Sequence, residues 1–263
     1  MLLAIDIGNT NVVIAVFKGE EIVHTWRIAT DTKRTGDEYK SILLTLMDDE
    51  KIAADQIDCA AVSSVVPDLT GPFITVATHF AGKKPVIVNP DIYDRLPIKL
   101  PEGAAHEIGT DLVCNAVAAW NLTHSANIVI DFGTALSFTI TDQNGLVRGV
   151  DIAPGLGTAV HSLSSGAAQL PTVPLVAPSS AIGTNTIHSI QAGIVLGYKG
   201  LVEYLISQIK SDLHKLTGVS EDQVRVVATG GLNSVLKPIT DVFTHVDRSL
   251  TMKGLRLIAG YAS

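Results

Sequence analysis

The sequence has 263 residues and a net charge of −7; 46% of its residues are hydrophobic, 17% charged and 5% aromatic. This apolar fraction supplies a sizeable core for one large domain or two smaller ones, and it argues against a disordered chain. A mildly acidic chain without a Lys/Arg-rich run is a poor match for a phosphate backbone, so we do not expect nucleic acid as a partner.

Three sequence features bear on the location of the protein. No stretch approaches the roughly 18 to 20 uninterrupted apolar residues that a membrane-spanning helix needs. Asp6 interrupts the N-terminal apolar run before the apolar region of a signal peptide forms. Cys59 and Cys114 lie far apart and make neither a disulfide framework nor a metal-ligand cluster. We therefore expect a cytoplasmic protein with no attachment to a membrane.

The first half of the chain begins with a strand–turn–strand pattern. Residues 3–17 read LAIDIGNTNVVIAVF, with apolar runs on both sides of a glycine-containing turn, and a further strand pattern follows at 21–28. Apolar residues at helical spacing predict a helix over 36–48. Short apolar runs at 59–66 and 85–88 predict two buried strands.

The second half begins with the same pattern. Residues 128–140 read IVIDFGTALSFTI, again a β-branched run, an aspartate, one apolar residue, a glycine and a second apolar run. Nearly half of the chain separates the two aspartates, Asp6 and Asp131. A long helical pattern covers 186–210, and an apolar run at 225–228 predicts a strand that leads into a Gly-Gly pair.

This repetition predicts a duplicated domain. Strands at the start of each half and helices after them indicate an α/β fold in two lobes, which we place at residues 1–113 and 114–263. Such an arrangement leaves a cleft between the lobes as the expected ligand site.

The first turn contains residues suited to phosphate binding. Gly8 lets backbone N–H groups approach a phosphate without a Cβ in the way. The three polar residues that follow add side-chain donors: Asn9, Thr10 and Asn11. Asp6, at the end of the preceding strand, is placed to hold Mg²⁺ directly or through water. An ordinary hairpin turn uses the same residue types, so this motif alone is a weak signal.

Two further elements strengthen the signal. Asp131, Gly133 and Thr134 repeat the chemistry of the first turn in the second half, and two such copies are suited to clamp a polyphosphate and its metal. The pair Gly230-Gly231 after a buried strand permits flat contact with a base or ribose, although it also fits a simple helix-start turn.

Together these turns resemble the pattern of the superfamily that contains actin and the sugar kinases. Within it, the sequence resembles the type III pantothenate kinases along nearly the whole chain. The matching segments are 6–17 (DIGNTNVVIAVF), 63–67 (SSVVP), 107–111 (EIGTD), 115–119 (NAVAA), 129–135 (VIDFGTA), 152–156 (IAPGL), 170–171 (LP), 182–197 (IGTNTIHSIQAGIVLG) and 228–232 (ATGGL).

The resemblance implies both a fold and a reaction. It implies two lobes of the ribonuclease-H type and a homodimer. It implies ATP-dependent phosphorylation of pantothenate to 4′-phosphopantothenate, the first step towards coenzyme A. The cofactors that it implies are ATP, Mg²⁺ and a monovalent cation, K⁺ or NH₄⁺.

The resemblance also implies roles for individual residues. Asp111 falls on the general base for the acceptor hydroxyl, Asp6 on the Mg²⁺ ligand and Asp131 on the monovalent-cation ligand. The expected ATP contacts are Asp6, Gly8, Asn9, Thr10, Asn11, Gly133, Thr134, Gly230 and Gly231, and the expected substrate contacts are Gly109, Thr110, Thr186 and, by its spacing from this motif, Glu102.

The position of Asp111 in the sequence also suits the role of a general base, independently of the resemblance. Asp111 follows Gly109-Thr110 and precedes the apolar, helix-like run 112–122, so we expect it at or near a helix N-terminus. Aspartate is a good helix cap, and capping alone is the competing explanation. A carboxylate positioned beside a hydroxyl also orients it and takes up its proton during phosphoryl transfer.

The departures from the family pattern gather on the acceptor side. Leu112 stands where the family has an arginine that holds the substrate. Glu102 stands where a tyrosine is usual, and Leu136 where a threonine is common. An arginine in this place makes a charge-assisted bond of about 1.5–3 kcal/mol.

Three explanations remain open from the sequence. Lys99, Arg95 or a partner subunit replaces the missing cation, and pantothenate remains the substrate. Alternatively, the chain phosphorylates a different small alcohol that lacks a carboxylate. A nucleotide-binding regulator without turnover is the third reading, and the retained Asp111 argues against it.

Overall fold

The computed structural model describes residues 1–101, 103, 105–166 and 170–262, and the chain divides into two compact units. The first unit comprises Met1–Ala118 together with the C-terminal segment that starts at Leu250, and the second is Ala119–Ser249. Each unit contains one sheet with helices, so the predicted two-lobed α/β class is confirmed.

The first unit is built on a sheet with the strand order β3-β2-β1-β4-β5. β1, β2 and β3 form an antiparallel meander, and β4 and β5 continue the sheet in parallel. The strands are β1 (Leu2–Ile7), β2 (Asn11–Lys18), β3 (Glu21–Ala29), β4 (Cys59–Ser64) and β5 (Val86–Ile87). The helices are α1 (Gly36–Asp49), α2 (Pro67–Ala81), the first part of α3 (Thr110–Thr123), α8 (Leu250–Ala262) and the 3₁₀ turns Ala54–Gln56 and Pro90–Arg95.

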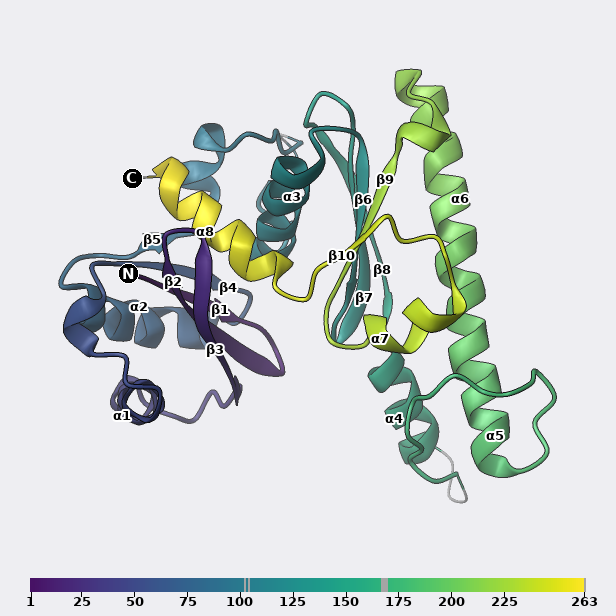
Figure 1. The fold of residues 1–263 in the computed structure, drawn as a ribbon, viewed down its shortest axis with the longest axis horizontal. Coiled ribbons are helices and arrows are strands. Elements are labelled where there is room, and N and C mark those ends of the chain that lie inside the picture. Colours follow the sequence, from purple (N-terminus) through teal and green to yellow (C-terminus); the bar gives the residue numbers. More distant parts are fainter. Residues whose placement is uncertain (102, 104, 167–169, 263) are drawn as a thin grey trace. The chain divides into compact units, whose positions relative to one another are not determined.

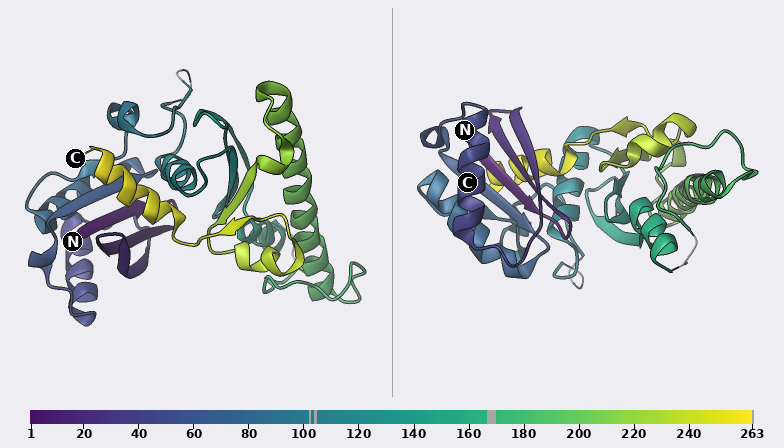
Figure 2. Two further views of the ribbon diagram at one scale, coloured as in Figure 1. Left: turned by 45° about the horizontal axis from the view of Figure 1, so that its top comes forward. Right: turned by 90° about the horizontal axis from the view of Figure 1, so that it is seen from below.

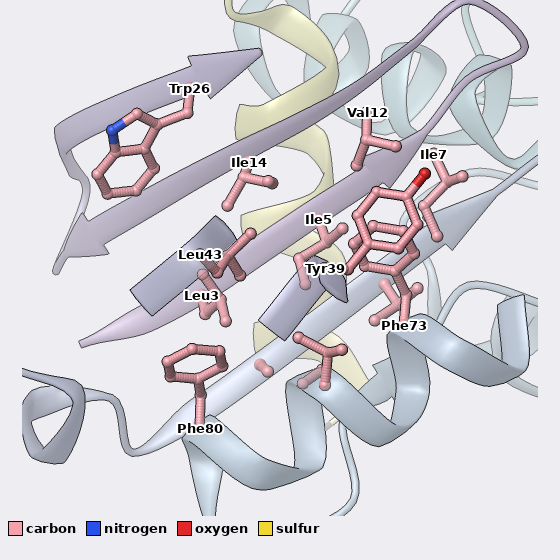
Figure 3. Close-up of a cluster of buried hydrophobic side chains, with 14 of the residues drawn as sticks. Leu3, Ile5, Ile7, Val12, Ile14, Trp26, Tyr39, Leu43, Phe73 and Phe80 are labelled. Carbon is pink, nitrogen blue, oxygen red and sulfur yellow. The ribbon is translucent and has the colours of Figure 1, made fainter. Parts of the chain in front are cut away.

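One face of this sheet carries the hydrophobic core of the first unit. Successive side chains of a strand point to opposite faces, so Leu3, Ile5 and Ile7 of β1 share one face, where they meet α1 and α2 (Figure 3). Tyr39 of α1 and Phe73 of α2 stack there with ring centroids 4.5 Å apart. Burial of these large side chains fixes both helices on the sheet.

The opposite face of β1 and β4 carries small or polar side chains, including Ala4 and Ala61. Helix α8 packs along β1 and β4, and Figures 1 and 2 show this yellow helix beside the purple strand β1. Gly254 of α8 lies so close to the backbone of Cys114 in α3 that a Cβ at this position would collide with it. The hydroxyl of Thr251 donates to Oδ1 of Asn115 at 2.8 Å.

The structure divides the chain differently from the predicted boundary between residues 113 and 114. The first unit extends to Ala118, and the segment from Leu250 onward returns to it from the far end of the chain. The close contact at Gly254 and the hydrogen bond from Thr251 explain this return, because both tie α8 to α3. A helical sequence pattern does not reveal which sheet its apolar face covers. The boundary predicted from the sequence therefore placed α8 in the second lobe.

The second unit repeats the sheet of the first. Its strand order is β10-β9-β6-β7-β8, in which β6, β7 and β8 are antiparallel and β9 and β10 continue in parallel from β6. The strands are β6 (Asn127–Phe132), β7 (Ala135–Thr141), β8 (Val147–Pro154), β9 (Arg225–Thr229) and β10 (His245–Val246). The helices are α4 (Leu156–Gly166), α5 (Thr186–Gln191), a π-helical segment (Ala192–Leu196), α6 (Gly197–Thr217), α7 (Asn233–Leu236) and the 3₁₀ turns Glu221–Gln223 and Lys237–Ile239.

The predicted duplication is therefore present in the sheets themselves. β6 takes the place of β1, β7 and β8 follow it as β2 and β3 follow β1, and β9 takes the place of β4. The long helix α6 lies along this sheet (Figure 1), where Val202 and Ile206 pack with Ile128 and Ile130 of β6. The predicted helix over 186–210 is present, but a π-helical segment interrupts it and it continues to Thr217.

Two further expectations concern membranes and thiols. Over the described ranges, no helix combines the length and the apolar character needed to cross a membrane. Cys59 and Cys114 are both free thiols.

The close approach of Gly254 to α3 predicts a position-specific effect of alanine in α8. Gly254→Ala should destabilise the protein by about 1–3 kcal/mol, because the new Cβ forces α8 away from Cys114. Gly260→Ala, in the same helix but with open space around the new Cβ, should be neutral or stabilising by up to about 1 kcal/mol. Urea unfolding of both variants measures the difference, and equal effects would contradict this account of the α8 contact.

Candidate active site

The turn that joins β1 and β2 is closed by its own backbone and held by the residue that follows β3. The N–H of Gly8 donates to the carbonyl of Asn11 at 3.0 Å and closes the turn. Thr30, directly after β3, donates from its hydroxyl to the carbonyl of Gly8 at 2.6 Å, and its N–H donates to the carbonyl of Thr10 at 3.0 Å. Asn9 and Thr10 are exposed at the tip. The predicted phosphate turn is thus an ordered turn with exposed polar residues.

Tyr39 holds Asp31, the residue after Thr30, in place. Its hydroxyl accepts from the N–H of Asp31 at 3.0 Å and donates to the carbonyl of Asp31 at 2.9 Å. Because Tyr39 is fully buried against Phe73, the core of the first unit fixes the chain next to Thr30. Sequence reasoning missed Thr30, since nothing in a polar loop distinguishes a threonine that reaches back to a distant turn.

A chain of hydrogen bonds joins the end of β1 to the start of α3. The hydroxyl of Ser63 donates to Oδ1 of Asp6 at 2.8 Å and lies 3.0 Å from the hydroxyl of Thr110. The N–H of Ser64 donates to the Thr110 hydroxyl oxygen, also at 3.0 Å. The hydroxyl of Thr110, expected to contact substrate, is therefore engaged in contacts within the first unit.

Asp111 lies in the first turn of α3, as predicted. Its Oδ1 accepts from the N–H of Leu112 at 2.9 Å, and the N–H of Val113 donates to the carbonyl of Gly109 at 3.1 Å. Gly109 makes room for this carboxylate, since a Cβ on it would lie 2.5 Å from Oδ1 of Asp111. Burial raises the pKa of Asp111 above its ordinary value, while its backbone hydrogen bonds oppose the rise.

The surroundings of Asp111 on α3 are apolar or neutral. Leu112 is only 9% exposed, so this position offers no cation to a substrate. Cys114 is buried, and both its burial and the nearby carboxylates of Asp6 and Asp111 raise the pKa of the thiol, which stays protonated. The thiol also lies within hydrogen-bonding reach of Ser63. Glu102, the remaining predicted substrate residue of this region, lies outside the described residues.

The turn between β6 and β7 contains the second copy of the predicted phosphate motif. The N–H of Gly133 donates to the carbonyl of Ala135 at 3.1 Å, and the turn is one residue shorter than its counterpart after β1. The carbonyl of Thr134 accepts from the N–H of Gly155 at 3.0 Å and from the hydroxyl of Thr158 at 2.7 Å. The start of α4 therefore holds this turn.

Gly155 has a packing role that the sequence analysis did not assign. A Cβ on Gly155 would collide with the carbonyl oxygens of Gly133 and Thr134, so only glycine allows the turn and α4 to meet. The signal was present in the sequence, since Gly155 belongs to the segment 152–156, which matches the family. Leu136 is fully buried in the core of the second unit, so that departure from the family pattern affects packing.

Gly230 brings the ends of β6 and β9 together. Its φ is +83°, and a Cβ would lie 2.6 Å from Oδ1 of Asp131 and 2.7 Å from the backbone of Phe132. Thr229 is paired with Asp131 across these strands and is only 1% exposed. Its hydroxyl finds no hydrogen-bond partner within the residues that the structure describes. Gly231 faces open space.

Thr186 begins α5 in the second unit. Asn185 precedes it as the helix cap and accepts from the N–H of His188 at 3.0 Å. Thr186 lines a mainly apolar cavity of about 440 Å³ between α4, α5 and the π-helical segment, together with Leu163, Leu170, Ser189, Ile190 and Ile194.

In the first unit, hydrogen bonds through Ser63 and Thr110 thus join Asp6, just before the turn at 8–11, to the start of α3, where Asp111 lies. The second unit brings together Asp131, the turn at Gly133 and the turn at Gly230. Thr186 lies at the apolar cavity of the second unit.

Comparison with known proteins identifies the family. The family model for type III pantothenate kinase matches residues 2–208. Type III pantothenate kinases from Geobacter sulfurreducens and Treponema pallidum are 39% and 40% identical; each alignment covers 98% of this chain, and 98% and 93% of the respective relative.

A solved structure supports the fold over the same length. The ethanolamine utilization protein EutJ from Carboxydothermus hydrogenoformans superposes with a TM-score of 0.55 at 13% identity, covering 97% of this chain and 89% of that protein. The fold is thus shared well beyond recognisable sequence similarity, whereas the family match rests on the sequence over nearly its full length. The chain belongs to the type III pantothenate kinase family and is a small-molecule kinase.

Proposed function

We propose that this chain transfers the γ-phosphoryl group of ATP to the hydroxyl of pantothenate and releases 4′-phosphopantothenate, which feeds coenzyme A biosynthesis. The observation that carries the proposal is the similarity to type III pantothenate kinases at about 40% identity over 98% of the chain. The first unit supports it, because Asp111 lies at a helix start that is hydrogen-bonded through Ser63 of β4 to Asp6 of β1.

Mg²⁺ and the ATP phosphates suit the turn after β1. Mg²⁺ prefers oxygen ligands and usually keeps several waters, with one or two carboxylates and the substrate phosphates completing its shell. Asp6 supplies one such carboxylate, and no group of three His, Cys, Asp or Glu side chains forms a metal site of its own among the described residues. Bound there, Mg²⁺ would neutralise charge on the transferring phosphoryl group. The turn at 8–11 would direct backbone and side-chain donors at the phosphates.

The second unit is suited to hold the phosphates and a monovalent cation. The turn at Gly133-Thr134 is proposed to contact the phosphates, and Gly230 and Gly231 the adenosine. Asp131 is proposed to hold K⁺ or NH₄⁺, and the hydroxyl of Thr229 supports this assignment. It is a buried oxygen paired in register with Asp131, with no partner in the described part of the chain.

Asp111 is proposed as the general base. Its carboxylate would accept the proton of the pantothenate hydroxyl as the oxygen attacks the γ-phosphorus. Burial favours this role because it raises the pKa of Asp111 and so makes the carboxylate a stronger base than an exposed one. The hydrogen bond from Leu112 fixes the orientation of the carboxylate.

The carboxylate of pantothenate needs a cation other than the missing arginine. Leu112 is buried and does not provide one. Arg95 donates from Nη1 to the carbonyl of Ala262 at 3.1 Å, which directs it towards the end of α8. Lys99 is exposed in the first unit, and we propose it, or a cation from a partner subunit, for this contact.

We also propose that the protein is a homodimer of the cytoplasm. Ile182 and Ile187, the latter next to Thr186 in α5, are large apolar side chains that are 78% and 50% exposed. A second copy of the chain would bury them and place Thr186 at the interface, where the family resemblance puts a substrate contact. The two free thiols fit a reducing compartment.

The proposed acceptor is tested by comparing pantothenate with an analogue that lacks its carboxylate. The protein should phosphorylate pantothenate with Mg·ATP and K⁺, and panthenol, in which an alcohol replaces the carboxylate, should show kcat/KM lower by about tenfold or more. A coupled ADP-release assay measures both. Equal rates for the two acceptors, combined with a tenfold gain on pantothenate in Leu112→Arg, would show that the natural acceptor lacks a carboxylate.

The role of Asp111 is tested by charge removal at constant size. Asp111→Asn should lower kcat by roughly 10²–10⁴-fold, while the affinity for ATP and the melting temperature change little, because asparagine still caps a helix. A stability loss with turnover within a few-fold of wild type would show that Asp111 is only a cap.

The same residue predicts a pH dependence. The base acts when it is ionised, so wild-type kcat/KM should be full above the raised pKa of Asp111 and fall as the pH drops through it, at a midpoint above 3.8. In Asp111→Asn this acid-side fall should disappear. A fall that persists unchanged in the variant would assign it to another group.

The dimer is tested at Ile187. Sedimentation equilibrium should give twice the monomer mass for the wild type and a shift towards monomer for Ile187→Glu, because a charge at a buried interface is costly. Val23→Glu is the matched control, since Val23 is a similarly exposed apolar residue on β3 of the first unit. An unchanged dimer in Ile187→Glu would remove this face from the interface.

A further inference from the structure

We propose that Ser63 is a positioning residue that holds Asp6 in its working orientation and ties it to the start of α3, where Asp111 lies. This inference rests on the proposed function, because it assigns Asp6 to Mg·ATP. Ser63 itself is 0% exposed, so it acts on the ligand through Asp6 and does not touch it.

The pairing of hydrogen-bond donors and acceptors gives this contact a direction. A carboxylate only accepts hydrogen bonds, so the Ser63 hydroxyl donates its single proton to Oδ1 of Asp6 at 2.8 Å. The 3.0 Å contact between Ser63 and Thr110 then has Thr110 as its donor. Thr110 in turn accepts from the N–H of Ser64. The relay therefore runs from the backbone of β4 through Thr110 and Ser63 to Asp6.

The register between β1 and β4 places Asp6 next to Ser63. Asp6 of β1 is paired with Ser63 of β4 in parallel register, so their side chains leave the sheet on the same face. The Ser63 hydroxyl that binds Asp6 also contacts Thr110, the residue before Asp111. It therefore helps to fix the first turn of α3. Loss of the Ser63 hydroxyl would remove one hydrogen bond from Oδ1 of Asp6 and, at the same time, the acceptor of the Thr110 hydroxyl.

Ser64 provides a control on the opposite face of the same strand. Its hydroxyl donates to the carbonyl of Val66 at 3.1 Å and accepts from Thr70 at 2.9 Å, at the start of α2. Removal of this hydroxyl leaves the Ser64 N–H, and with it the bond to Thr110, in place. Ser63→Ala and Ser64→Ala therefore remove the same atom from neighbouring residues, and only the first removal reaches Asp6.

The duplicated sheet shows that the pairing is not a requirement of the fold. Asp131 and Thr229 occupy the positions of Asp6 and Ser63 in the second unit, again paired in parallel register. There the hydroxyl has no hydrogen-bond partner among the described residues. An aspartate and a hydroxyl at these positions thus form the bond in one copy and leave the hydroxyl unused in the other, so the bond in the first unit is a property of that site.

The experiment measures how Ser63→Ala and Ser64→Ala change the binding and the turnover of Mg·ATP. Ser63→Ala should lower kcat/KM for Mg·ATP by about 10- to 100-fold, the effect of losing a hydrogen bond to a charged group, and should weaken Mg·ATP binding in calorimetry. The KM for pantothenate should change much less. Ser64→Ala should lower the melting temperature at least as much as Ser63→Ala, yet change the Mg·ATP parameters by less than about threefold.

A double-mutant cycle with Asp6→Asn tests whether Ser63 acts through Asp6. In the Asp6→Asn background, Ser63→Ala should cost less than about threefold more in Mg·ATP binding, because the carboxylate that it positions is already gone. Additive losses, or equal losses in Ser63→Ala and Ser64→Ala, would overturn the inference. If Ser63→Ala does not fold, Ser63→Cys replaces it in the cycle, with a loss of threefold or more that vanishes in the Asp6→Asn background as the supporting result.

The two proposals fail in different measurements. A wild-type protein that binds Mg·ATP but does not phosphorylate pantothenate would overturn the proposed acceptor, and the binding cycle would still decide the role of Ser63. A wild-type protein that phosphorylates pantothenate with an additive cycle would overturn the role of Ser63 alone.

Discussion

The parallel register between β1 and β4 is the constraint on which the candidate site of the first unit depends. It pairs Asp6 with Ser63 and places the ends of both strands at one edge of the sheet. Thr110 bonds to this edge and so fixes the start of α3, where burial raises the pKa of Asp111. A slip of one residue would turn Ser63 to the face of α2 and break the whole relay.

The two faces of this sheet do different work. Large side chains such as Ile5 and Tyr39 fill the face under α1 and α2, and Tyr39 also fixes the chain next to Thr30, which holds the turn at 8–11. On the other face, small side chains and Gly254 let α8 approach β1, β4 and α3 closely. Both faces of these strands therefore contribute to the geometry of the candidate site.

The sequence was informative about structural features that have a local signature. The glycine turns after β1 and β6, the aspartates before them and the helix start at Asp111 were all predicted, because strand ends, turns and caps have local signatures. It was less informative about contacts between distant segments. The support of the phosphate turn by Thr30, the link from Ser63 to Thr110 and the return of α8 to the first unit join residues with no common motif. Each becomes visible only once the strand register is known.

A crystal structure with Mg²⁺, a non-hydrolysable ATP analogue and pantothenate would test the central claim most directly. The account predicts the ATP phosphates at the turn of residues 8–11, Mg²⁺ bound by Asp6 directly or through water, and the pantothenate hydroxyl against the carboxylate of Asp111. It also predicts that the hydrogen bond from Ser63 to Asp6 is retained in the complex. Phosphates bound away from this turn, or a pantothenate hydroxyl that faces a residue other than Asp111, would contradict it.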